Sequence, residues 1–435
     1  MKKLLTLLLS LTLAIGVFAA CGGETANESN EEAKLLVKTN DVTVSEVVNT
    51  EGVDYSNVKI GLITLHGKSS TYDKNFIDAM EEASTELGFQ YVLVTDVPES
   101  VKCSEIAEDL INNQDCNVIF ADSFGHENFL MNIAEKYPQV QFCHATGTYA
   151  HTEGIANYHN AFASIYEGRY VAGVVAGLKL AEMYNAGTLK ENNFDGDNVK
   201  VGYVGAFTYA EVMSGYTSWF LGVRNTFESL VENKSVSMEV QFTGSWYDED
   251  AEKSAAETLI ANGAALISQH ADSMGAPSAC EIAKVPNVSY NGSTVESCPN
   301  TFLISSRIDW APYFKYIATC VAKTEPIATD WCGTIANGAV VLTDMNENVV
   351  AAGTAAKVEE VLTQLKNKEL KVFSTSTFTV GGKTLTSYGA DVDSDAAYAH
   401  ETEVISNGYF HESQYRSAPY FDIQIDGIKL LNTKF

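Results

Sequence analysis

Two patterns of apolar residues alternate along the chain. Short apolar runs predict buried strands, and stretches in which apolar residues recur three or four positions apart predict helices. The run 58–65 predicts a strand, and the helix after it carries Phe76, Met80 and Ala83 on one face and stops at Gly88. Strand and helix then repeat with short links, which is typical of a doubly wound parallel sheet.

The stretch 117–129 shows this organisation most clearly. Residues 117–121 form an apolar run, residues 122–125 interrupt it, and apolar residues then return at helical spacing. A turn between a strand and a helix lies at the carboxyl edge of a parallel sheet, where open α/β sheets bind their ligands. Ser123, Phe124 and Gly125 are therefore candidate ligand-binding residues. The alternative is an ordinary connection with Phe124 in the core.

A second strand–helix series begins near residue 199, which predicts a second lobe. We expect an α/β fold of two doubly wound parallel-sheet lobes joined by a hinge, with the ligand in the cleft between them. The expected boundaries are 55–165 for the first lobe, with a return segment at about 300–325, and 166–298 for the second lobe, with about 330–370.

Residues 371–435 form a C-terminal extension. Gly381-Gly382 and Asp426-Gly427 each predict a hairpin within it. Residues 391–395 begin like a calcium-binding loop, but Ala396 stands where that loop needs a glycine. We therefore expect a solvated acidic loop and no metal there.

The first twenty-one residues are typical of an export signal. Lys2 and Lys3 precede an apolar stretch, 4–18, that is too short for a transmembrane helix. The end of this segment, Val-Phe-Ala-Ala-Cys21, resembles a bacterial lipobox. That resemblance implies cleavage before Cys21 and a lipid on its thiol, which would hold the protein at the extracytoplasmic face of the cell membrane. The alternative is a plain secreted protein cleaved nearby. Residues 22–54 are expected to form a flexible tether.

Length and charge exclude some classes of protein. A chain of 435 residues predicts two domains, and a formal charge of −28 disfavours nucleic-acid polymers as partners. Seven cysteines besides Cys21 lie mostly in apolar stretches, which favours buried thiols, with the pairs Cys280–Cys298 and Cys320–Cys332 as the alternative. The chain lacks a GxSxG elbow, an HExxH helix and a phosphate-binding loop. We therefore expect neither an enzyme nor a cofactor.

Seven segments follow predicted strands and are expected to meet at the cleft; they are 69–75, 122–125, 207–211, 245–247, 269–273, 290–292 and 309–310. These segments are rich in aromatic and neutral hydrogen-bonding side chains and lack a cluster of cations for phosphate. Aromatic faces stack on a flat ring, while Asn, Asp and Ser hydrogen-bond its edge, so a flat heteroaromatic ligand fits. The alternative for each aromatic side chain is core packing.

Several blocks, in order, resemble the basic membrane protein family, the purine-nucleoside-binding lipoproteins of ABC importers. The blocks are 121–125 (ADSFG), 138–147 (PQVQFCHATG), 166–173 (YEGRYVAG), 205–212 (GAFTYAEV), 243–248 (TGSWYD), 269–273 (QHADS) and 331–341. The resemblance covers residues 58–346. It implies a type I periplasmic-binding fold and delivery of a purine nucleoside or base to ABC permease subunits. We expect a monomer.

By this resemblance, Tyr72 or Phe76 stacks on the purine together with Phe207. Asn291 stands where many members have the aspartate that grips a ribose, and the partner lysine has no clear counterpart, Arg307 or Asp309 being nearest. The loss of both charged groups favours a base or another small ligand. The expected ligand-binding residues are Tyr72, Asn75, Phe76, Ser123, Phe124, Gly125, Phe207, Trp246, Asp272, Asn291 and Trp310.

Two other functions are compatible with the sequence. One is a sensor receptor of the same fold for another small molecule, such as a sugar or an autoinducer-like compound. The other is an enzyme that processes nucleosides, which product formation would reveal.

Overall fold

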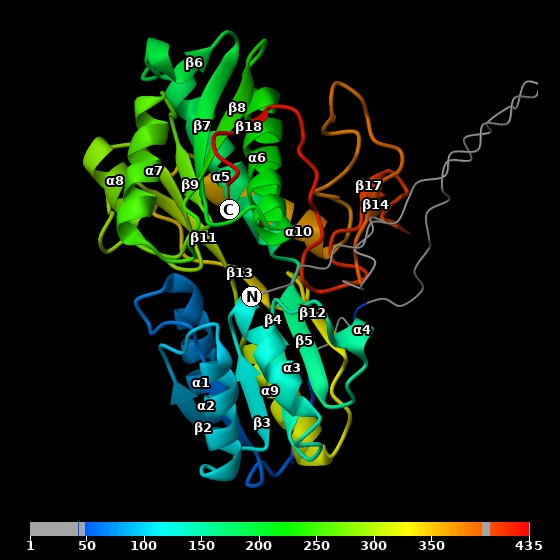
Figure 1. The fold of residues 1–435 in the computed structure, drawn as a ribbon. Coiled ribbons are helices and arrows are strands. Elements are labelled where there is room, and N and C mark those ends of the chain that lie inside the picture. Colours follow the sequence, from blue (N-terminus) through cyan, green and yellow to red (C-terminus); the bar gives the residue numbers. More distant parts are fainter. Residues whose placement is uncertain (1–41, 43–47, 394–400, 435) are drawn as a thin grey trace, which may run out of the picture. The chain divides into compact units, whose positions relative to one another are not determined.

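The computed structural model describes residues 42, 48–393 and 401–434 (Figure 1). The predicted signal segment, the predicted lipidation site Cys21 and most of the predicted 22–54 tether lie outside the described residues. The described chain forms two parallel sheets with helices packed against them, which confirms the predicted α/β fold class.

The first sheet has the strand order β12-β5-β4-β3-β1-β2, and all of its neighbouring pairs are parallel. Its strands are β1 (Lys59–Ile63), β2 (Gln90–Val94), β3 (Val118–Ala121), β4 (Gln141–Ala145), β5 (Tyr158–Ala163) and β12 (Asp330–Gly333). Val118 and Phe120 of β3 face one hydrophobic cluster, and Ile119 and Ala121 face the other. Because both faces of the sheet are buried, this strand is apolar throughout.

Helices cover both faces of the first sheet. They are α1 (Thr71–Leu87) and α9 (Ala311–Lys323) on one face, α2 (Val101–Asn112) and α3 (Glu127–Ala134) on the other, and the short α4 (Ala150–Glu153) after β4. Helix α1 ends at Gly88, in the left-handed conformation with φ of 82°, as predicted. Its N-cap is Ser70, whose side chain accepts a hydrogen bond from the Asp73 backbone N–H.

The second sheet has the strand order β13-β11-β10-β9-β7-β8-β18, with β6 paired to β7. Its strands are β6 (Phe194–Asp195), β7 (Asn198–Gly205), β8 (Ser235–Phe242), β9 (Ile267–Gln269), β10 (Asn287–Tyr290), β11 (Phe302–Ile308), β13 (Val340–Leu342) and β18 (Ile428–Leu430). The pairs of β13 with β11 and of β6 with β7 are antiparallel, and the other pairs are parallel.

Five helices accompany the second sheet: α5 (Ile165–Asn185), α6 (Ala210–Leu230), α7 (Glu249–Ala261), α8 (Gly275–Ala283) and α10 (Thr354–Lys366). Helices α5 and α6 pack closely because glycines face each other. A Cβ atom at Gly173 would lie 2.2 Å from the Trp219 carbonyl oxygen, and one at Gly222 would lie 2.3 Å from the Tyr170 carbonyl oxygen. These close contacts pack α5 and α6 tightly together in the second lobe.

The chain passes between the sheets three times: between β5 and α5, between β11 and α9, and between β12 and β13. Within the expected return segment 300–325, α9 packs beside α1 on the first sheet, but β11 pairs with β10 in the second sheet, contrary to the expectation. The expected place of residues 330–370 in the second lobe is wrong for β12, which pairs with β5. A short apolar strand carries no local signal for its partner, because pairing depends on contacts far apart in sequence.

Four short strands of the C-terminal extension pair with one another, as β14–β15 and β16–β17: β14 (Gly389–Ala390), β15 (Thr402–Glu403), β16 (Ile405–Ser406) and β17 (Tyr409–Phe410). The turn at Gly381-Gly382 is present, with Val380 and Lys383 bonded across it. The hairpin predicted at Asp426-Gly427 is wrong, because β18 pairs in parallel with β8. Residues 394–400, which include part of the predicted acidic loop, lie outside the described residues.

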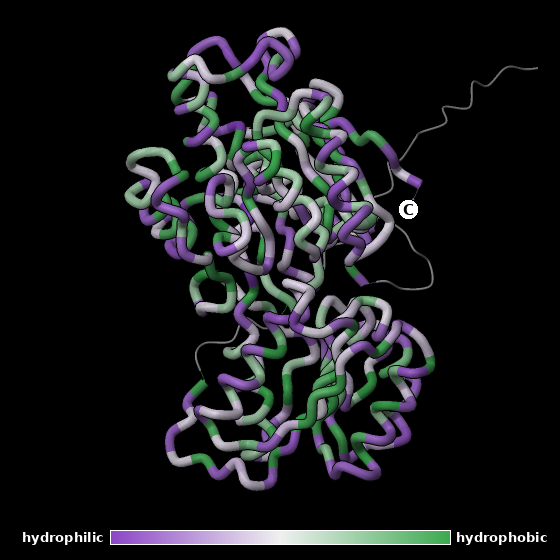
Figure 2. The backbone as a smooth tube through the Cα atoms, turned by 90° about the vertical axis from the view of Figure 1, so that its left-hand side faces the viewer, coloured by the Kyte–Doolittle hydropathy of each residue, from purple (hydrophilic) through white to green (hydrophobic). Residues whose placement is uncertain are grey.

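Apolar segments run through the inside of both lobes, and polar segments follow their outer edges (Figure 2). All seven cysteines of the described chain are buried free thiols, as the apolar context predicted. The helices described by the structure all fall short of the length or apolar character that a membrane span needs.

Candidate ligand-binding cleft

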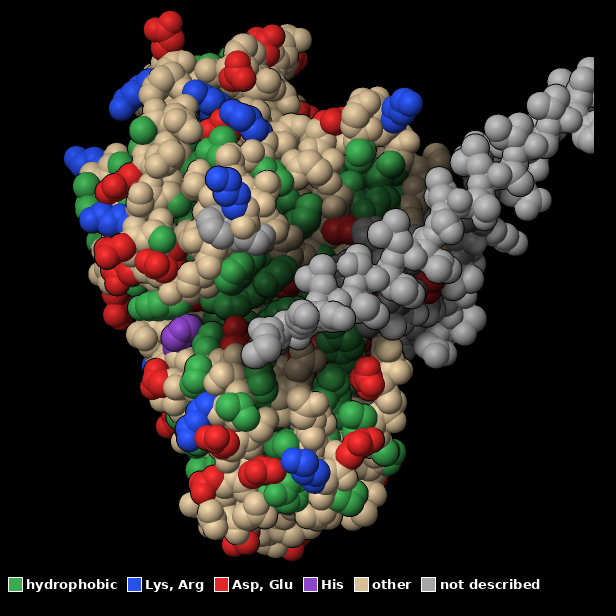
Figure 3. All heavy atoms as spheres, in the orientation of Figure 1, with side chains coloured by type: hydrophobic (Ala, Val, Ile, Leu, Met, Phe, Trp, Pro, Cys, Tyr) green, Lys and Arg blue, Asp and Glu red, His purple; other side chains and the backbone are tan. Residues whose placement is uncertain are grey.

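A cavity of about 380 Å³ is lined by both lobes and by the C-terminal extension. Its lining residues are Leu65, His66, Tyr72, Asp73, Ser123, Phe124, Thr146, Thr148, Tyr149 and Phe162 of the first lobe, Thr208, Tyr209, Ala210, Glu211, Trp246, His270, Asp272 and Tyr290 of the second lobe, and Asp391, Arg416, Ala418, Pro419, Tyr420 and Asp422 of the extension. Most of the lobe residues follow the carboxyl ends of strands, as the topology of open α/β sheets requires. Hydrophobic side chains gather between the lobes on the face seen in Figure 3.

Aromatic side chains from the two lobes meet in this cavity. Phe124 of the first lobe and Tyr209 of the second have ring centroids 5.3 Å apart. They are 40% and 42% exposed, unusually high for side chains of this size beside a buried core. Phe207 stacks on Tyr209 at 5.2 Å and meets Trp246 edge-on at 4.9 Å. The result is an accessible aromatic surface with faces from both lobes.

A buried network fixes the orientation of Glu211. The Nε2 atom of His270 lies 2.7 Å from Glu211 Oε2, and its Nδ1 atom lies 3.0 Å from Arg169 Nη2. A guanidinium group only donates hydrogen bonds, so Nδ1 accepts and the imidazole proton lies on Nε2, directed at Glu211. Burial lowers the pKa of His270, and the nearby Arg169 adds to this effect. His270 is therefore neutral and positions the Glu211 carboxylate.

Arg169 itself is fully buried beneath the cavity. Its Nη1 donates to the Gln269 carbonyl oxygen at 3.0 Å, and its guanidinium carbon lies 3.6 Å from the centre of the Tyr290 ring. It thus fixes Tyr290 as well as His270, although it lies behind the lining.

Asp73 of the first lobe and Asp272 of the second lobe both line the cavity, and their carboxyl groups influence each other. The pKa of Asp272 is raised well above its usual value, chiefly by burial and then by the negative charge of Asp73. Asp272 Oδ1 accepts a hydrogen bond from Asn291 Nδ2 at 3.1 Å. Asp73 accepts hydrogen bonds from Ser70 Oγ at 2.5 Å and from the His66 backbone N–H at 2.7 Å. These bonds hold both acids in place at the cleft.

Two residues after strands adopt the left-handed backbone conformation that favours glycine. They are Thr146, with φ of 62°, and Asn291, with φ of 63°. A β-branched residue rarely adopts such an angle, and backbone strain of this kind concentrates at ligand sites. Thr146 lines the cavity, which agrees with that expectation.

The charge of the lining disfavours anionic ligands. It includes five carboxyl groups (Asp73, Glu211, Asp272, Asp391 and Asp422), one arginine and no lysine. Within the part of the chain that the structure describes, no three His, Cys, Asp or Glu side chains converge to hold a metal ion. The site therefore suits a ligand that donates hydrogen bonds through N–H or O–H groups.

Five of the eleven residues predicted to bind ligand line the cavity: Tyr72, Ser123, Phe124, Trp246 and Asp272. Phe207 supports them from behind, through its ring contacts with Tyr209 and Trp246. Gly125 lies beside the lining, where its backbone N–H donates to Glu99 at 2.7 Å and a Cβ atom would require the Glu99 side chain to move.

The remaining four predicted residues do not face the cavity. Phe76 and Trp310 stack on each other at 4.4 Å inside the first lobe, and each is at most 1% exposed. Phe76 lies one helical turn beyond Tyr72 on the same face of α1, and this places it over the sheet instead of at its edge. Asn75 and Asn291 bind each other across the cleft, at 3.0 Å from Asn75 Nδ2 to the Asn291 carbonyl oxygen.

Sequence reasoning missed several lining residues, including Thr146, Thr148 and Tyr149, which lie outside every segment predicted to meet at the cleft. Tyr209, Glu211, His270 and Tyr290 lie within the segments expected at the cleft, but no local signal separates them from their neighbours. Arg416 and Tyr420 belong to the extension, for which neither periodicity nor resemblance made a prediction. The available signal was composition, since Arg416 is the sole arginine of residues 371–435 and lies among tyrosines.

Comparison with known proteins gives the family. Residues 60–376 match the family described as ABC transporter substrate-binding protein, PnrA-like. A putative ABC transporter glucose-binding protein of Haloferax volcanii is 29% identical over 357 residues, covering 81% of this chain and 84% of that protein. A purine-binding protein of Brucella abortus is 31% identical over 197 residues, covering 45% of this chain and 49% of that protein.

Solved structures share the fold at low identity. An ABC transporter solute-binding protein from Aeropyrum pernix has a TM-score of 0.60 at 16% identity and covers 75% of this chain and 94% of its own. Another from Conexibacter woesei has a TM-score of 0.55 at 18% identity and covers 72% of this chain and 98% of its own. The family match spans most of the chain and agrees with the expectation of a binding protein that is not an enzyme. The chain therefore belongs to the PnrA-like family of ABC transporter substrate-binding proteins.

Proposed function

We propose that this protein captures a purine base or purine nucleoside in the cleft at the extracytoplasmic face of the cell membrane and delivers it to an ABC permease. Binding favours the arrangement in which the two lobes contact each other, and that arrangement presents the surface that the permease recognises.

The contact between Phe124 and Tyr209 carries this proposal. One ring comes from each lobe, both are accessible, and Trp246 lies 5.9 Å from Tyr209, measured between ring centroids. A planar heteroaromatic ring that separates Phe124 from Tyr209 gains a stacking partner on each face, worth about 1–3 kcal/mol per face.

The polar lining supports the same ligand class. Glu211 accepts hydrogen bonds, and its direction is fixed by His270. The N–H groups at the edge of a purine are suitable donors for it. Phosphorylated compounds are unsuitable, because the lining has five carboxyl groups and one arginine.

A sugar is the second candidate ligand, because one relative is described as a putative glucose-binding protein and a second as a purine-binding protein. Acidic side chains with nearby aromatic rings also suit hydroxyl groups and the apolar faces of a pyranose. The exposed aromatic pair, which matches a planar ring better than a puckered one, favours the purine.

Isothermal titration calorimetry of the protein against adenine, guanine, adenosine, guanosine, glucose and ribose tests the proposal. We expect heat with at least one purine compound and none with the free sugars. Heat with the sugars alone would overturn it. Release of a chemically changed product from any nucleoside would identify an enzyme instead.

The proposal includes cleavage of the signal peptide before Cys21 and attachment of the protein to the membrane through a lipid on Cys21. Cys21 lies outside the described residues, so the support is the lipobox-like sequence alone. Partitioning of the wild type and of Cys21→Ser into detergent is the test, and an unchanged partition would contradict it. We further propose a monomer, which sedimentation velocity would check.

A further inference from the structure

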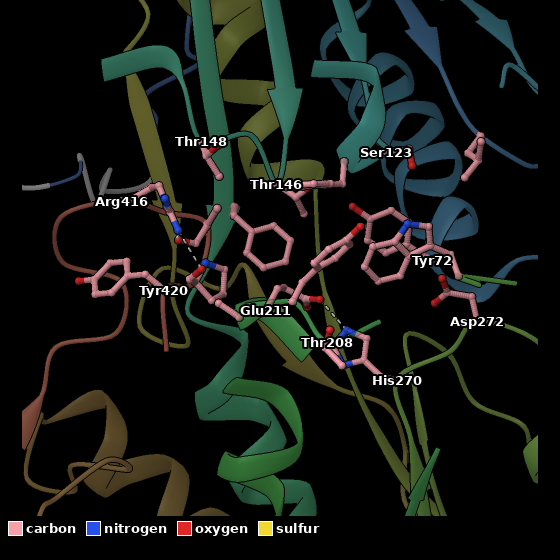
Figure 4. A pocket seen from close by; sticks show the side chains of 18 of the residues that line it. Tyr72, Ser123, Thr146, Thr148, Thr208, Glu211, His270, Asp272, Arg416 and Tyr420 are labelled. Carbon is pink, nitrogen blue, oxygen red and sulfur yellow. Dashed lines mark hydrogen bonds and ion pairs between the residues drawn. The ribbon is translucent and has the colours of Figure 1, made fainter. Parts of the chain in front are cut away.

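The two ends of the cavity are lined by different parts of the chain. In Figure 4, Tyr72, Ser123 and Asp272 lie on one side, Arg416, Tyr420 and Thr148 on the other, and Glu211 between them. The aromatic cluster belongs to the first side, since Phe124 follows Ser123 in the chain and the Trp246 carbonyl oxygen accepts from the Asp272 backbone N–H at 3.0 Å. The second end is contributed largely by the extension, beyond the residues that match the family.

The extension is anchored to both lobes. The Ser417 backbone N–H donates to Asp330 Oδ2 in β12 of the first lobe at 2.9 Å. Ser214 of α6 donates to Glu412, and β18 joins the second sheet beside β8. Phe421 stacks on Phe373 at 4.3 Å within the extension. These contacts make residues 416–422 a preorganised wall of the site.

The polar groups of this wall pair donors with acceptors. Arg416 donates to the carbonyl oxygens of Ala418 and Pro419 at 3.1 Å each, which folds the loop around its guanidinium group. The carboxylates of Asp391 and Asp330 act on the same guanidinium, so this end carries no excess positive charge. Tyr388 donates to Asp422 Oδ1 at 2.7 Å and fixes that carboxylate at the cavity.

Alternating donors and acceptors without net positive charge suit hydroxyl groups, because a hydroxyl both donates and accepts. A phosphate would meet the carboxylates of Asp391 and Asp422 and be repelled. Asn291 is not available to hold a sugar, since its side chain binds Asp272 and its carbonyl oxygen binds Asn75.

We propose that Asp422, Arg416 and Thr148 form a subsite for the hydroxyl groups of the sugar of a purine nucleoside, while the purine lies among Phe124, Tyr209 and Trp246. This inference rests on the proposed function and deepens it. The C-terminal extension thereby makes the protein prefer nucleosides to free bases, although the base-binding half of the cleft is built without it.

The test is calorimetry of the wild type and of two variants with guanosine, guanine, adenosine and adenine. The wild type is expected to bind each nucleoside about tenfold or more tightly than its base, since several hydroxyl hydrogen bonds are added. Ala418→Leu fills the subsite, and Asp422→Asn removes its charge. Both are expected to reduce nucleoside affinity about tenfold or more while changing base affinity less than about threefold. Retained base binding also demonstrates that each variant is folded.

Asp426→Asn is the matched control. Asp426 also belongs to the extension, but its carboxylate binds Thr379 and the backbone N–H groups of Gly381 and Gly382, away from the cavity. It is expected to leave the ratio of nucleoside to base affinity unchanged. A change in that ratio as large as that of Asp422→Asn would contradict a direct contact.

The outcomes separate the two proposals. If neither bases nor nucleosides bind the wild type, the proposed function fails and this inference with it. If purines bind but bases bind as tightly as nucleosides, or if both subsite variants weaken base and nucleoside equally, only this inference is overturned. Tighter binding of guanosine 5′-monophosphate than of guanosine would also overturn it, since it would assign an anion to this end.

Discussion

Asn75 in helix α1 of the first lobe donates a hydrogen bond from Nδ2 to the carbonyl oxygen of Asn291 in the second lobe, at 3.0 Å. The neighbouring Thr71 donates to the Asp272 carbonyl oxygen from both its backbone N–H and its hydroxyl, each at 3.1 Å. These hydrogen bonds join the two lobes directly across the cleft. Asn75 and Asn291, expected from the sequence to bind ligand, act instead between the lobes.

Loss of the Asn75 contact is therefore expected to weaken ligand binding without direct contact to the ligand. Asn75→Ala removes one buried hydrogen bond, which costs about 0.5–1.5 kcal/mol and corresponds to roughly two- to tenfold weaker binding. Calorimetry with the best purine ligand measures this. Asn112→Ala is the control, since Asn112 Nδ2 bonds Tyr137 Oη at 3.1 Å within the first lobe. Equal effects of the two substitutions would contradict a role in closure.

Phe124 lines the cavity and Phe76 lies in the core, so substitutions at the two positions are expected to have different effects. Phe124→Ala is expected to weaken purine binding by about 1–3 kcal/mol through the lost stacking face. Phe76→Ala is expected to lower the free energy of unfolding by about 3–5 kcal/mol, because Phe76 is completely buried against Trp310. Calorimetry and urea unfolding of both variants measure these effects. If Phe76→Ala lost binding while keeping its stability, the assignment of Phe76 to the core would be wrong.

Glu211 is expected to accept hydrogen bonds from the ligand. Glu211→Gln retains the shape of the side chain but loses its charge, and we expect purine affinity to fall about 10- to 100-fold. The unfolding midpoint in urea should change little, since the carboxylate lies at the cavity. Glu228→Gln is the control on the same helix, where Glu228 accepts from Ser235 away from the cavity. Unchanged affinity of Glu211→Gln would exclude Glu211 from ligand recognition.

Glu412 predicts a pH dependence of stability. Burial raises its pKa to about 8, and the nearby negative charges of Glu211 and Glu167 add to this effect. Because the folded pKa exceeds the unfolded value, the folded state binds the extra proton between about pH 4.5 and pH 8. Stability therefore falls as pH rises through this window, by on the order of 5 kcal/mol for this group.

Glu412→Gln keeps an acceptor for Ser214 and removes the titration. As pH rises from 5 to 8, the free energy of unfolding of the wild type is expected to fall relative to that of the variant. Urea denaturation of both proteins at several pH values would measure this change. Glu360→Gln, at an exposed position of α10, serves as the control. Parallel curves for wild type and Glu412→Gln would be inconsistent with a buried, protonated Glu412.

The apolar pattern was sufficient for the local structure of the lobes. The run 118–121 became β3 because both faces of the sheet are buried, so every side chain in it is apolar. Gly88 ended α1 because the αL conformation there costs a glycine little. Six of the seven segments predicted after strands contribute residues to the cavity, because the carboxyl ends of parallel strands share one edge. The seventh, 309–310, does not, since Trp310 lies in the core.

The apolar pattern could not predict which side chains face the cavity or which sheet a strand joins, because both depend on residues far away in the sequence. Tyr72 and Phe76 lie on one face of α1, and only the packing of that helix on the sheet separates the cavity residue from the core residue. Strand β11 pairs in the second sheet and β12 in the first, although neither sequence carries a local signal for its partner. In residues 371–435 no periodic pattern indicated that Arg416 and Tyr420 would reach the cleft.

The sequence by itself determined the family, the α/β class and the edge of each sheet where ligand binds, because these follow from strand order, apolar periodicity and short motifs. The tertiary structure alone decided which aromatic rings face each other, which polar groups are used to close the lobes, and that the extension forms a wall of the cavity. The physical reason is that a site between lobes is made of contacts between residues hundreds of positions apart, and such contacts leave no periodic signature in any one segment.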